Sequence, residues 1–229
     1  MASSDFGSKT FAAWRDAAGR TWTDYVDHAF VRQLGDGSLP RTSFLHYLVQ
    51  DYVFLIHFSR AWALAVVKSE SLEEMKTAAG TVDGLVNHEM QLHVQICKEA
   101  GISEEQLYSA EEAFENLAYT RYVTDAGLSG DFLDMMAALA PCVFGYGEIG
   151  NMLKQSAADN TPYQDWIDTY SGPEYQEVCA NVGAMIDNAV AARLGEAPQE
   201  NPRWGKLNER FRTATQLEVG FWDMGLRGK

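Results

Sequence analysis

Cys142 is the cysteine whose surroundings most favour chemistry. It follows a proline inside the apolar stretch AALAPCVFGYGEIG, residues 137–150. A buried cysteine usually acts as a small hydrophobic residue, and only its thiolate form is a good nucleophile. Pro141 frees a backbone carbonyl and is expected to kink the helix. Tyr146 lies four residues after Cys142, on the same helical face. We therefore expect a cavity lined by a thiol and a phenol.

A nucleophilic thiol needs a neighbouring base or cation. All five histidines precede Cys142, so the cysteine-then-histidine order of papain-like enzymes is absent, and carboxylates deserve equal weight as partners. Asp51 is the only acid in FLHYLVQDYVFLIHF, and Glu218 lies in ATQLEVGFWDM. An acid in such surroundings either has a partner or lines a cavity. The simpler alternatives are a buried aspartate bonded to backbone or arginine, and a glutamate on a helix surface.

A metal site is the weaker interpretation. Glu89 and His93 have the i,i+4 spacing of one half of a carboxylate-bridged di-iron site. A complete site would need a second such pair, and the sequence offers only Asp24 with His28. The pair is better explained as a surface or core-edge feature, and we expect no metal and no cofactor.

Composition limits the class of protein. The chain has 229 residues, 46% of them hydrophobic and 22% charged, and a net charge of −14, which disfavours nucleic acid and anionic membranes as partners. The longest apolar run, AWALAVV, is too short to span a bilayer, and the first eleven residues have no apolar signal core. The three cysteines lack metal or disulfide spacing, which is typical of a reducing cytoplasm.

The elements that must position these residues are predicted to be helices. Residues 41–140 contain no proline, and apolar residues recur throughout at spacings of three and four. We expect helices near residues 9–33, 41–68, 71–100, 110–126 and 131–155, a short one that starts in GISEEQL, and stretches introduced by Pro162, Pro173 and Pro202. Ser71 and Glu74 predict a capping box. The sequence therefore predicts one all-α domain of about eight helices, spanning residues 1–229.

The order of motifs resembles that of the TenA family, the thiaminase II or aminopyrimidine aminohydrolase group. The resemblance covers nearly the whole chain and runs through HAFVRQLGDGSLP, FLHYLVQDYVFLIHFSRAWALA, EMQLH, LSGDF, AALAPCVFGYGEIG, YQDWIDTYSG and LEVGFWDM. Ala29 stands where the family usually has proline. This resemblance implies a haem-oxygenase-like helical bundle and a homotetramer.

The resemblance also implies roles for individual residues. Cys142 matches the family's nucleophile, Asp51 the aspartate that hydrogen-bonds the aminopyrimidine, and Glu218 the glutamate that acts as acid and base. The tyrosines that line the site and orient the cysteine and glutamate are matched by Tyr119, Tyr146 and Tyr170. Phe54 stands where some members have tyrosine, which keeps ring stacking but loses a hydroxyl contact. Tyr122 and Trp222 are further possible wall residues.

The implied reaction is hydrolysis of the C–N bond at the pyrimidine methylene. The substrate would be 4-amino-5-aminomethyl-2-methylpyrimidine, which gives the hydroxymethyl pyrimidine and ammonia, with thiamin as a slower substrate. Two alternatives remain open at this stage. One is a non-catalytic thiamin or pyrimidine binding module, and the other is a metal-dependent oxygenase on the same fold.

Overall fold

The computed structural model describes residues 5–228. Within that range the chain forms twelve α-helices, one π-helix and one 3₁₀ helix, and no strand. They are α1 (Lys9–Ala18), α2 (Arg20–Val26), α3 (Ala29–Asp36), α4 (Arg41–Lys68), α5 (Leu72–Gly84), η1 (Leu85–Glu89), α6 (Met90–Glu99), α7 (Glu104–Tyr108), α8 (Phe114–Ser129), α9 (Phe132–Ser156), α10 (Gln164–Ser171), α11 (Pro173–Leu194), η2 (Pro198–Glu200) and α12 (Trp204–Arg227). The predicted all-α class is confirmed.

The helices are more numerous than expected because short backbone breaks divide the first predicted segment. Gly19 has a positive φ of 54°, which separates α1 from α2. The side chain of His28 accepts a hydrogen bond from the backbone N–H of Phe30 and so starts α3. The predicted helix at residues 71–100 stays helical without a break from α5 to α6, and the π-helix η1 lies between them.

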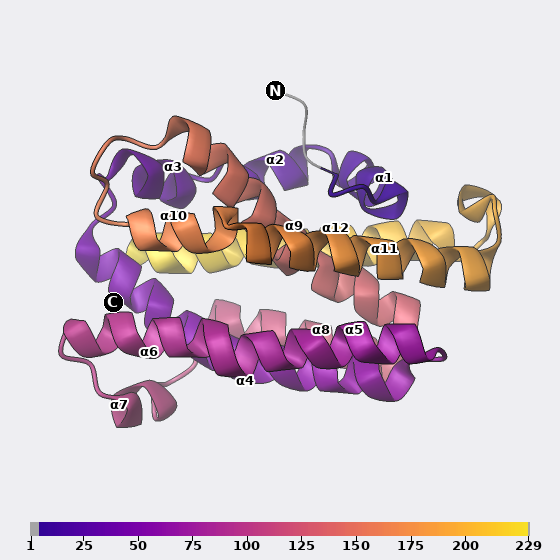
Figure 1. Ribbon diagram of the computed structural model, residues 1–229, viewed down its shortest axis with the longest axis horizontal. Coiled ribbons are helices and arrows are strands. Elements are labelled where there is room, and N and C mark those ends of the chain that lie inside the picture. The colour runs from indigo at the N-terminus through magenta and orange to yellow at the C-terminus, as the bar shows by residue number, and fades with distance from the viewer. Residues whose placement is uncertain (1–4, 229) are drawn as a thin grey trace.

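The helices form two groups joined by α9. Figure 1 shows α4, α5, α6 and α8 on one side, and α1, α2, α3, α10, α11 and α12 on the other. α9 runs diagonally from one group to the other and packs against α8, α10, α11 and α12. Its central place explains why this stretch is so apolar, since it has no face directed to water.

Pro141 does not break α9, which continues from Phe132 to Ser156 with the proline inside it. This continuity counts against our interpretation of the proline as the feature that opens a cavity. α9 is also long and apolar enough to cross a membrane, with a mean hydropathy of 1.3 over its best window. However, 89% of that window is buried inside the fold, as in a central core helix.

A buried ion pair ties α5 to α11. The predicted capping box of Ser71 and Glu74 is confirmed at the start of α5. The carboxylate of Glu74 also accepts hydrogen bonds from Arg193 of α11 at 2.6 and 3.0 Å. The guanidinium of Arg193 lies over the ring of Phe132, 5.0 Å from its centroid. One carboxylate thus caps a helix and joins two elements that face each other across a groove.

We predict that Glu74→Gln lowers the free energy of unfolding at pH 7 by about 2 kcal/mol, because the guanidinium of Arg193 loses its buried charge partner and keeps the exposed Glu70 at 3.2 Å. The arginine and the cap hold the pKa of Glu74 below its usual value. The stabilisation should therefore be present above the ordinary glutamate pKa and be lost as the pH falls through the lowered value.

Urea unfolding followed by circular dichroism measures this effect. Glu73→Gln is the matched control, since Glu73 lies beside Glu74 but pairs with Lys76 in an exposed position. The Glu73→Gln variant should lose less than about 1 kcal/mol of its free energy of unfolding. Equal losses in the two variants would contradict the assigned role of Glu74.

Candidate active site

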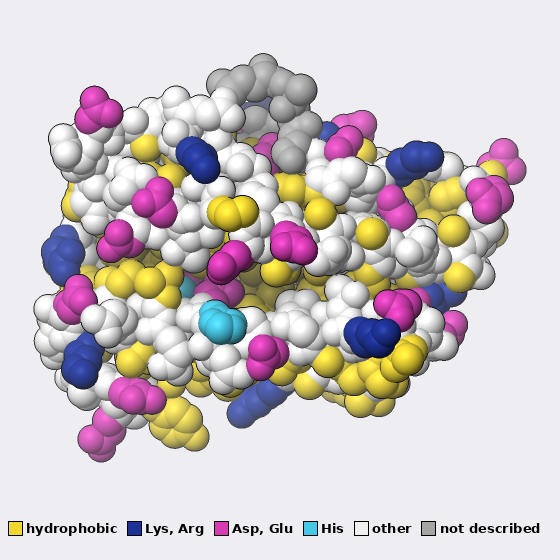
Figure 2. All heavy atoms as spheres, in the orientation of Figure 1, with side chains coloured by type: hydrophobic (Ala, Val, Ile, Leu, Met, Phe, Trp, Pro, Cys, Tyr) yellow, Lys and Arg dark blue, Asp and Glu magenta, His cyan; other side chains and the backbone are white. Residues whose placement is uncertain are grey.

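A large cavity opens between the two groups of helices. Its volume is about 1290 Å³, and it is lined by α5 and η1 on one side and by α10 and α11 on the other, with Cys142 among the lining residues. Figure 2 shows the corresponding furrow, with acidic side chains on both of its sides. Cys142 is 8% exposed. The cavity beside Cys142 therefore exists because these two pairs of helices lie apart from each other.

Cys142 and Glu218 form the first ionisable pair of the site. Cys142 of α9 hydrogen-bonds through its thiol to the carboxyl group of Glu218 on α12. The hydroxyl of Tyr119 on α8 donates a hydrogen bond to Glu218 Oε1 at 2.8 Å. Glu218 and Tyr119 are buried, with 2% and 0% exposed. Three helices distant in sequence thus bring together three of the predicted site residues.

Burial makes both groups of this pair hold their protons. Burial raises the pKa of Glu218 to about 8, with a further rise from Asp51, although Tyr119 and Cys142 oppose it through hydrogen bonds. Burial also raises the pKa of Cys142 well above its usual value, and the charges of Glu218, Glu89 and Asp51 add to the rise. At neutral pH the pair is therefore mostly a neutral thiol beside a neutral carboxylic acid. Such an acid can donate a proton to a ligand and then accept the proton of the thiol.

Asp51 belongs to a second pair, with His93. Asp51 Oδ2 lies 2.6 Å from His93 Nε2, and both side chains are almost fully buried. His93 Nδ1 lies 2.9 Å from the backbone carbonyl oxygen of Glu89. Because that carbonyl can only accept, Nδ1 must carry a proton. Burial lowers the pKa of His93, but the hydrogen bond and charge of Asp51, together with the charge and backbone carbonyl of Glu89, raise it overall, which favours an imidazolium beside the carboxylate.

Tyrosines and a tryptophan extend the Asp51 pair. Tyr47, one helical turn before Asp51, donates its hydroxyl hydrogen bond to Oδ2 at 3.1 Å. The same hydroxyl accepts a hydrogen bond from Trp166 Nε1 at 3.2 Å and lies 3.4 Å from the hydroxyl of Tyr146. Within residues 5–228, the hydrogen bonds of Asp51 all use Oδ2. Oδ1 therefore remains for a ligand.

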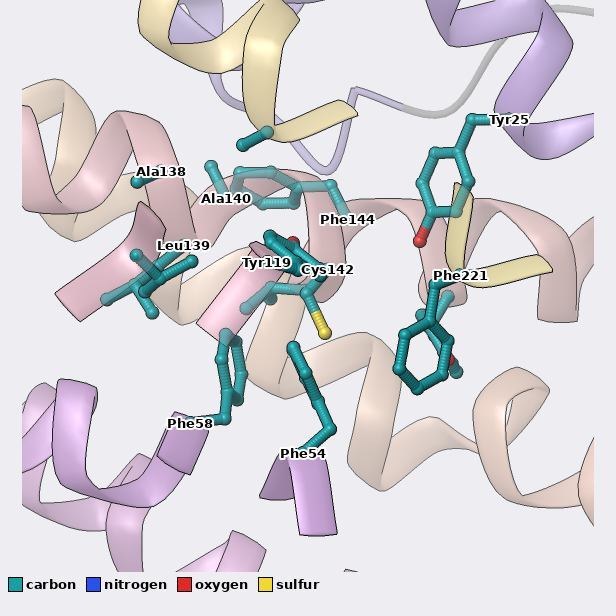
Figure 3. Packing of buried hydrophobic residues seen from close by; sticks show 14 of the residues in the cluster. Tyr25, Phe54, Phe58, Tyr119, Ala138, Leu139, Ala140, Cys142, Phe144 and Phe221 are labelled. Atoms are coloured by element: carbon teal, nitrogen blue, oxygen red, sulfur yellow. The ribbon is translucent and has the colours of Figure 1, made fainter. Parts of the chain in front are cut away.

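Aromatic rings form the walls around Cys142. Figure 3 shows the sulfur of Cys142 directed toward Phe54, with Phe58, Tyr119 and Phe221 around it. The Phe54 ring lies 5.0 Å from that of Tyr119 and 5.5 Å from that of Phe221, measured between centroids. Phe54 lies in the wall as expected, with no hydroxyl to offer. These faces suit a flat heteroaromatic ring.

Tyr170 lies in the site but orients a different acid from the one we expected. Its hydroxyl donates to Oε1 of Glu89, at 2.6 Å, and its ring packs on Tyr146 with centroids 4.8 Å apart. Glu89 is the last residue of the π-helix η1 and lines the cavity. Short π-helices occur often at functional sites, since the extra residue re-aims a side chain.

The described residues contain no group of three or more His, Cys, Asp or Glu side chains that could hold a metal ion. The spacing of Glu89 and His93 has another explanation. The bond between them joins the imidazole of His93 to a backbone carbonyl, while the carboxylate of Glu89 binds Tyr170. The interpretation of the pair as half of a metal site is therefore wrong.

The sequence analysis missed Tyr25 and Tyr47, and it considered Glu89 and His93 only as a possible half of a metal site. Tyr47 could have been predicted from the sequence, because it lies four residues before Asp51 and therefore on the same helical face. Tyr25 of α2 reaches the site through Gly145, where a Cβ atom would lie 2.1 Å from the tyrosine ring. Its hydroxyl points toward the space beside Cys142 and Phe221 (Figure 3). That approach depends on tertiary packing and leaves no local pattern in the sequence.

The coupling of Cys142 to Glu218 predicts how fast the thiol is alkylated. At pH 9 Glu218 is mostly ionised, and its charge opposes the formation of thiolate. Glu218→Gln should therefore accelerate iodoacetamide labelling of Cys142 at pH 9, by about tenfold for each unit by which the thiol pKa falls. At pH 7 the two proteins should differ much less.

Peptide mass spectrometry measures the labelling of Cys142 separately from that of the other two cysteines. Glu209→Gln, which alters an exposed carboxylate on the same helix, should label at the wild-type rate. An unchanged or slower rate for Glu218→Gln at pH 9 would contradict the electrostatic coupling.

Comparisons with known proteins agree with this fold. The model of the TENA/THI-4/PQQC family matches residues 15–228. Proteins named aminopyrimidine aminohydrolase from Halalkalibacterium halodurans and Bacillus subtilis are 37% and 30% identical, over 89% and 93% of this chain and 89% and 88% of their own.

Solved structures are similar over most of their length. A TenA family transcription regulator from Silicibacter sp. TM1040 is 58% identical, with a TM-score of 0.94 over 96% of this chain and 97% of that one. A protein from Shewanella denitrificans OS217 with a heme oxygenase-like fold is 14% identical, with a TM-score of 0.72 over 94% of this chain and 91% of that one, which shows the shared fold alone. The chain belongs to the TENA/THI-4/PQQC family.

Proposed function

We propose that the protein is a thiaminase II-type hydrolase that cleaves the C–N bond at the methylene of an aminopyrimidine. The observation that carries this proposal is the buried Cys142–Glu218 pair, whose cysteine lines the large cavity and is surrounded by aromatic rings. The names of the relatives, aminopyrimidine aminohydrolase, support the same reaction. The substrate is 4-amino-5-aminomethyl-2-methylpyrimidine, and thiamin is hydrolysed more slowly.

Asp51 binds the edge of the pyrimidine. Its Oδ2 is held by His93 and Tyr47, so Oδ1 accepts a hydrogen bond from the exocyclic amino group. The ring lies among the aromatic side chains around Cys142, with Phe54 and Tyr146 as walls. Because the acceptor and the walls are already in place, binding costs little reorganisation.

Glu218 and Cys142 carry the chemistry. Glu218 donates its proton to a ring nitrogen and takes the thiol proton as the sulfur of Cys142 bonds to a ring carbon. This addition breaks aromaticity, and the ring nitrogen then expels the protonated amine as ammonia, the C–N electron pair leaving on nitrogen. Water adds to the methylene and gives a proton to the ammonia. The C–S bond then breaks, its electron pair returns to sulfur, and the ring N–H proton returns to Cys142 through Glu218.

Three further features belong to the proposal. Residues 1–229 form one functional domain, which is consistent with the family match over residues 15–228. The protein acts in the cytoplasm, consistent with its three free cysteines. It assembles as a homotetramer, for which light scattering would give four times the chain mass of 25.5 kDa.

The two alternatives make different demands on the site. A non-catalytic pyrimidine-binding module has no need of a thiol hydrogen-bonded to a buried acid, and tight binding without turnover would favour it. A metal-dependent oxygenase needs a set of donor side chains, and residues 5–228 offer no group of three. The Cys142–Glu218 pair favours hydrolysis over both.

We predict that Cys142→Ala lowers the rate of ammonia release from the aminomethyl pyrimidine by at least about a thousandfold, because no other thiol can bond to the ring. Binding of the hydroxymethyl pyrimidine, measured by calorimetry, should survive. Cys97→Ala is the control, since Cys97 is buried on α6 and does not line the cavity. Full activity of Cys142→Ala would eliminate the nucleophile role.

A further inference from the structure

The mechanism above leaves without a role one of the three carboxylates whose charges act on Cys142. Glu89 lines the cavity, is half-buried, and is held by the hydroxyl of Tyr170 at 2.6 Å. Within residues 5–228 its carboxylate makes this one hydrogen bond, through Oε1. Oε2 is therefore available to a ligand in the cavity.

The charges of the site single out Glu89. The charge of Asp51 is balanced by the imidazolium of His93, 2.6 Å away. Glu218, with a pKa of about 8, is mostly neutral at pH 7. Glu89 has no cation of its own within hydrogen-bond distance, because His93 contacts its backbone and not its carboxylate. Of the three carboxylates whose charges act on Cys142, Glu89 is thus the negative charge that lacks a matching cation.

We propose that Glu89, oriented by Tyr170, forms the subsite for the departing amine and binds a primary ammonium group on the pyrimidine methylene. This inference rests on the proposed function and adds the recognition of the leaving group. An ammonium group has one positive charge and N–H donors, which suit a carboxylate oxygen beside a tyrosine hydroxyl. A thiazolium ring nitrogen has the charge but no N–H, so the subsite favours the aminomethyl substrate over thiamin.

The subsite also has a chemical consequence. Transfer of an amine into an apolar cavity favours its neutral form. A neutral amine would have to leave as an amide anion, which is a very poor leaving group. The carboxylate of Glu89 keeps the amine protonated, so that the C–N bond breaks with its electron pair on nitrogen and neutral ammonia departs. The positive charge passes to the pyrimidine ring, and the ammonia is no longer attracted to Glu89.

Several titratable groups face Glu89 and affect its charge. Burial raises the pKa of Glu89, and Asp51 adds to the rise, whereas His93 and Tyr170 lower it. The charge of Glu89 in turn contributes to raising the pKa values of Tyr47, Cys142 and Tyr175. Affinity for a cationic ligand should therefore weaken as the pH falls through the pKa of Glu89, while affinity for a neutral ligand should not follow that transition.

The test compares two ligands in proteins that cannot turn them over. Cys142→Ala and Cys142→Ala/Glu89→Gln are titrated calorimetrically with the aminomethyl pyrimidine, a cation at neutral pH, and with the neutral hydroxymethyl pyrimidine. We expect the added Glu89→Gln to weaken binding of the aminomethyl compound at least tenfold and of the hydroxymethyl compound less than twofold. The matched control is Glu174→Gln, an exposed carboxylate of the same cavity, which should change neither.

The outcomes separate this inference from the proposed function. Binding of both pyrimidines with an unchanged preference in the Glu89→Gln protein would overturn the subsite and leave the proposed function standing. An equal loss for both ligands would also overturn it, since that result reports a structural role. Failure of the Cys142→Ala protein to bind either pyrimidine would overturn the proposed function and the subsite with it. In otherwise wild-type enzyme, Glu89→Gln should also move the high-pH limb of kcat to lower pH, because the bound amine then loses its proton more easily.

Discussion

The buried ion pair of Asp51 and His93 is the interaction on which the site depends. It joins α4 to α6, and through the Glu89 carbonyl it also holds the π-helix between α5 and α6. A lone aspartate in this apolar helix would be strongly unfavourable. The imidazolium balances its charge, and the hydroxyl of Tyr47 shares the same oxygen. The pair thereby fixes the position of a ligand acceptor at the centre of the fold.

The site contains three carboxylates in three different environments. Asp51 is paired with a cation, Glu218 with a thiol and a tyrosine, and Glu89 with a tyrosine alone. Burial raises the pKa of Glu218 to about 8 and also raises that of Glu89, which His93 and Tyr170 lower in turn. An acid that holds its proton and a carboxylate that keeps its charge can therefore serve one ligand at neutral pH, which is the arrangement that acid–base chemistry requires.

The helical fold could be predicted from the sequence because its signals are local. Apolar spacing predicted the long helices, and Ser71 with Glu74 predicted a capping box that the structure confirms. Cys142, Asp51 and Glu218 stood out because each is a reactive or charged residue in an apolar helix. The hydrogen bond of Cys142 to Glu218, and the approach of His93 to Asp51, could not be predicted, since they join helices far apart in sequence. The helix predicted at residues 131–155 with Pro141 inside it is confirmed, since α9 continues through the proline.

The central claim is that the protein hydrolyses an aminopyrimidine by adding water to its methylene. The most direct measurement is turnover of 4-amino-5-aminomethyl-2-methylpyrimidine in ¹⁸O-labelled water, with ammonia counted and the product analysed by mass spectrometry. Our account predicts a hydroxymethyl pyrimidine that carries one labelled oxygen, with one ammonia released per product. Absence of turnover, or a product without the label, would contradict it.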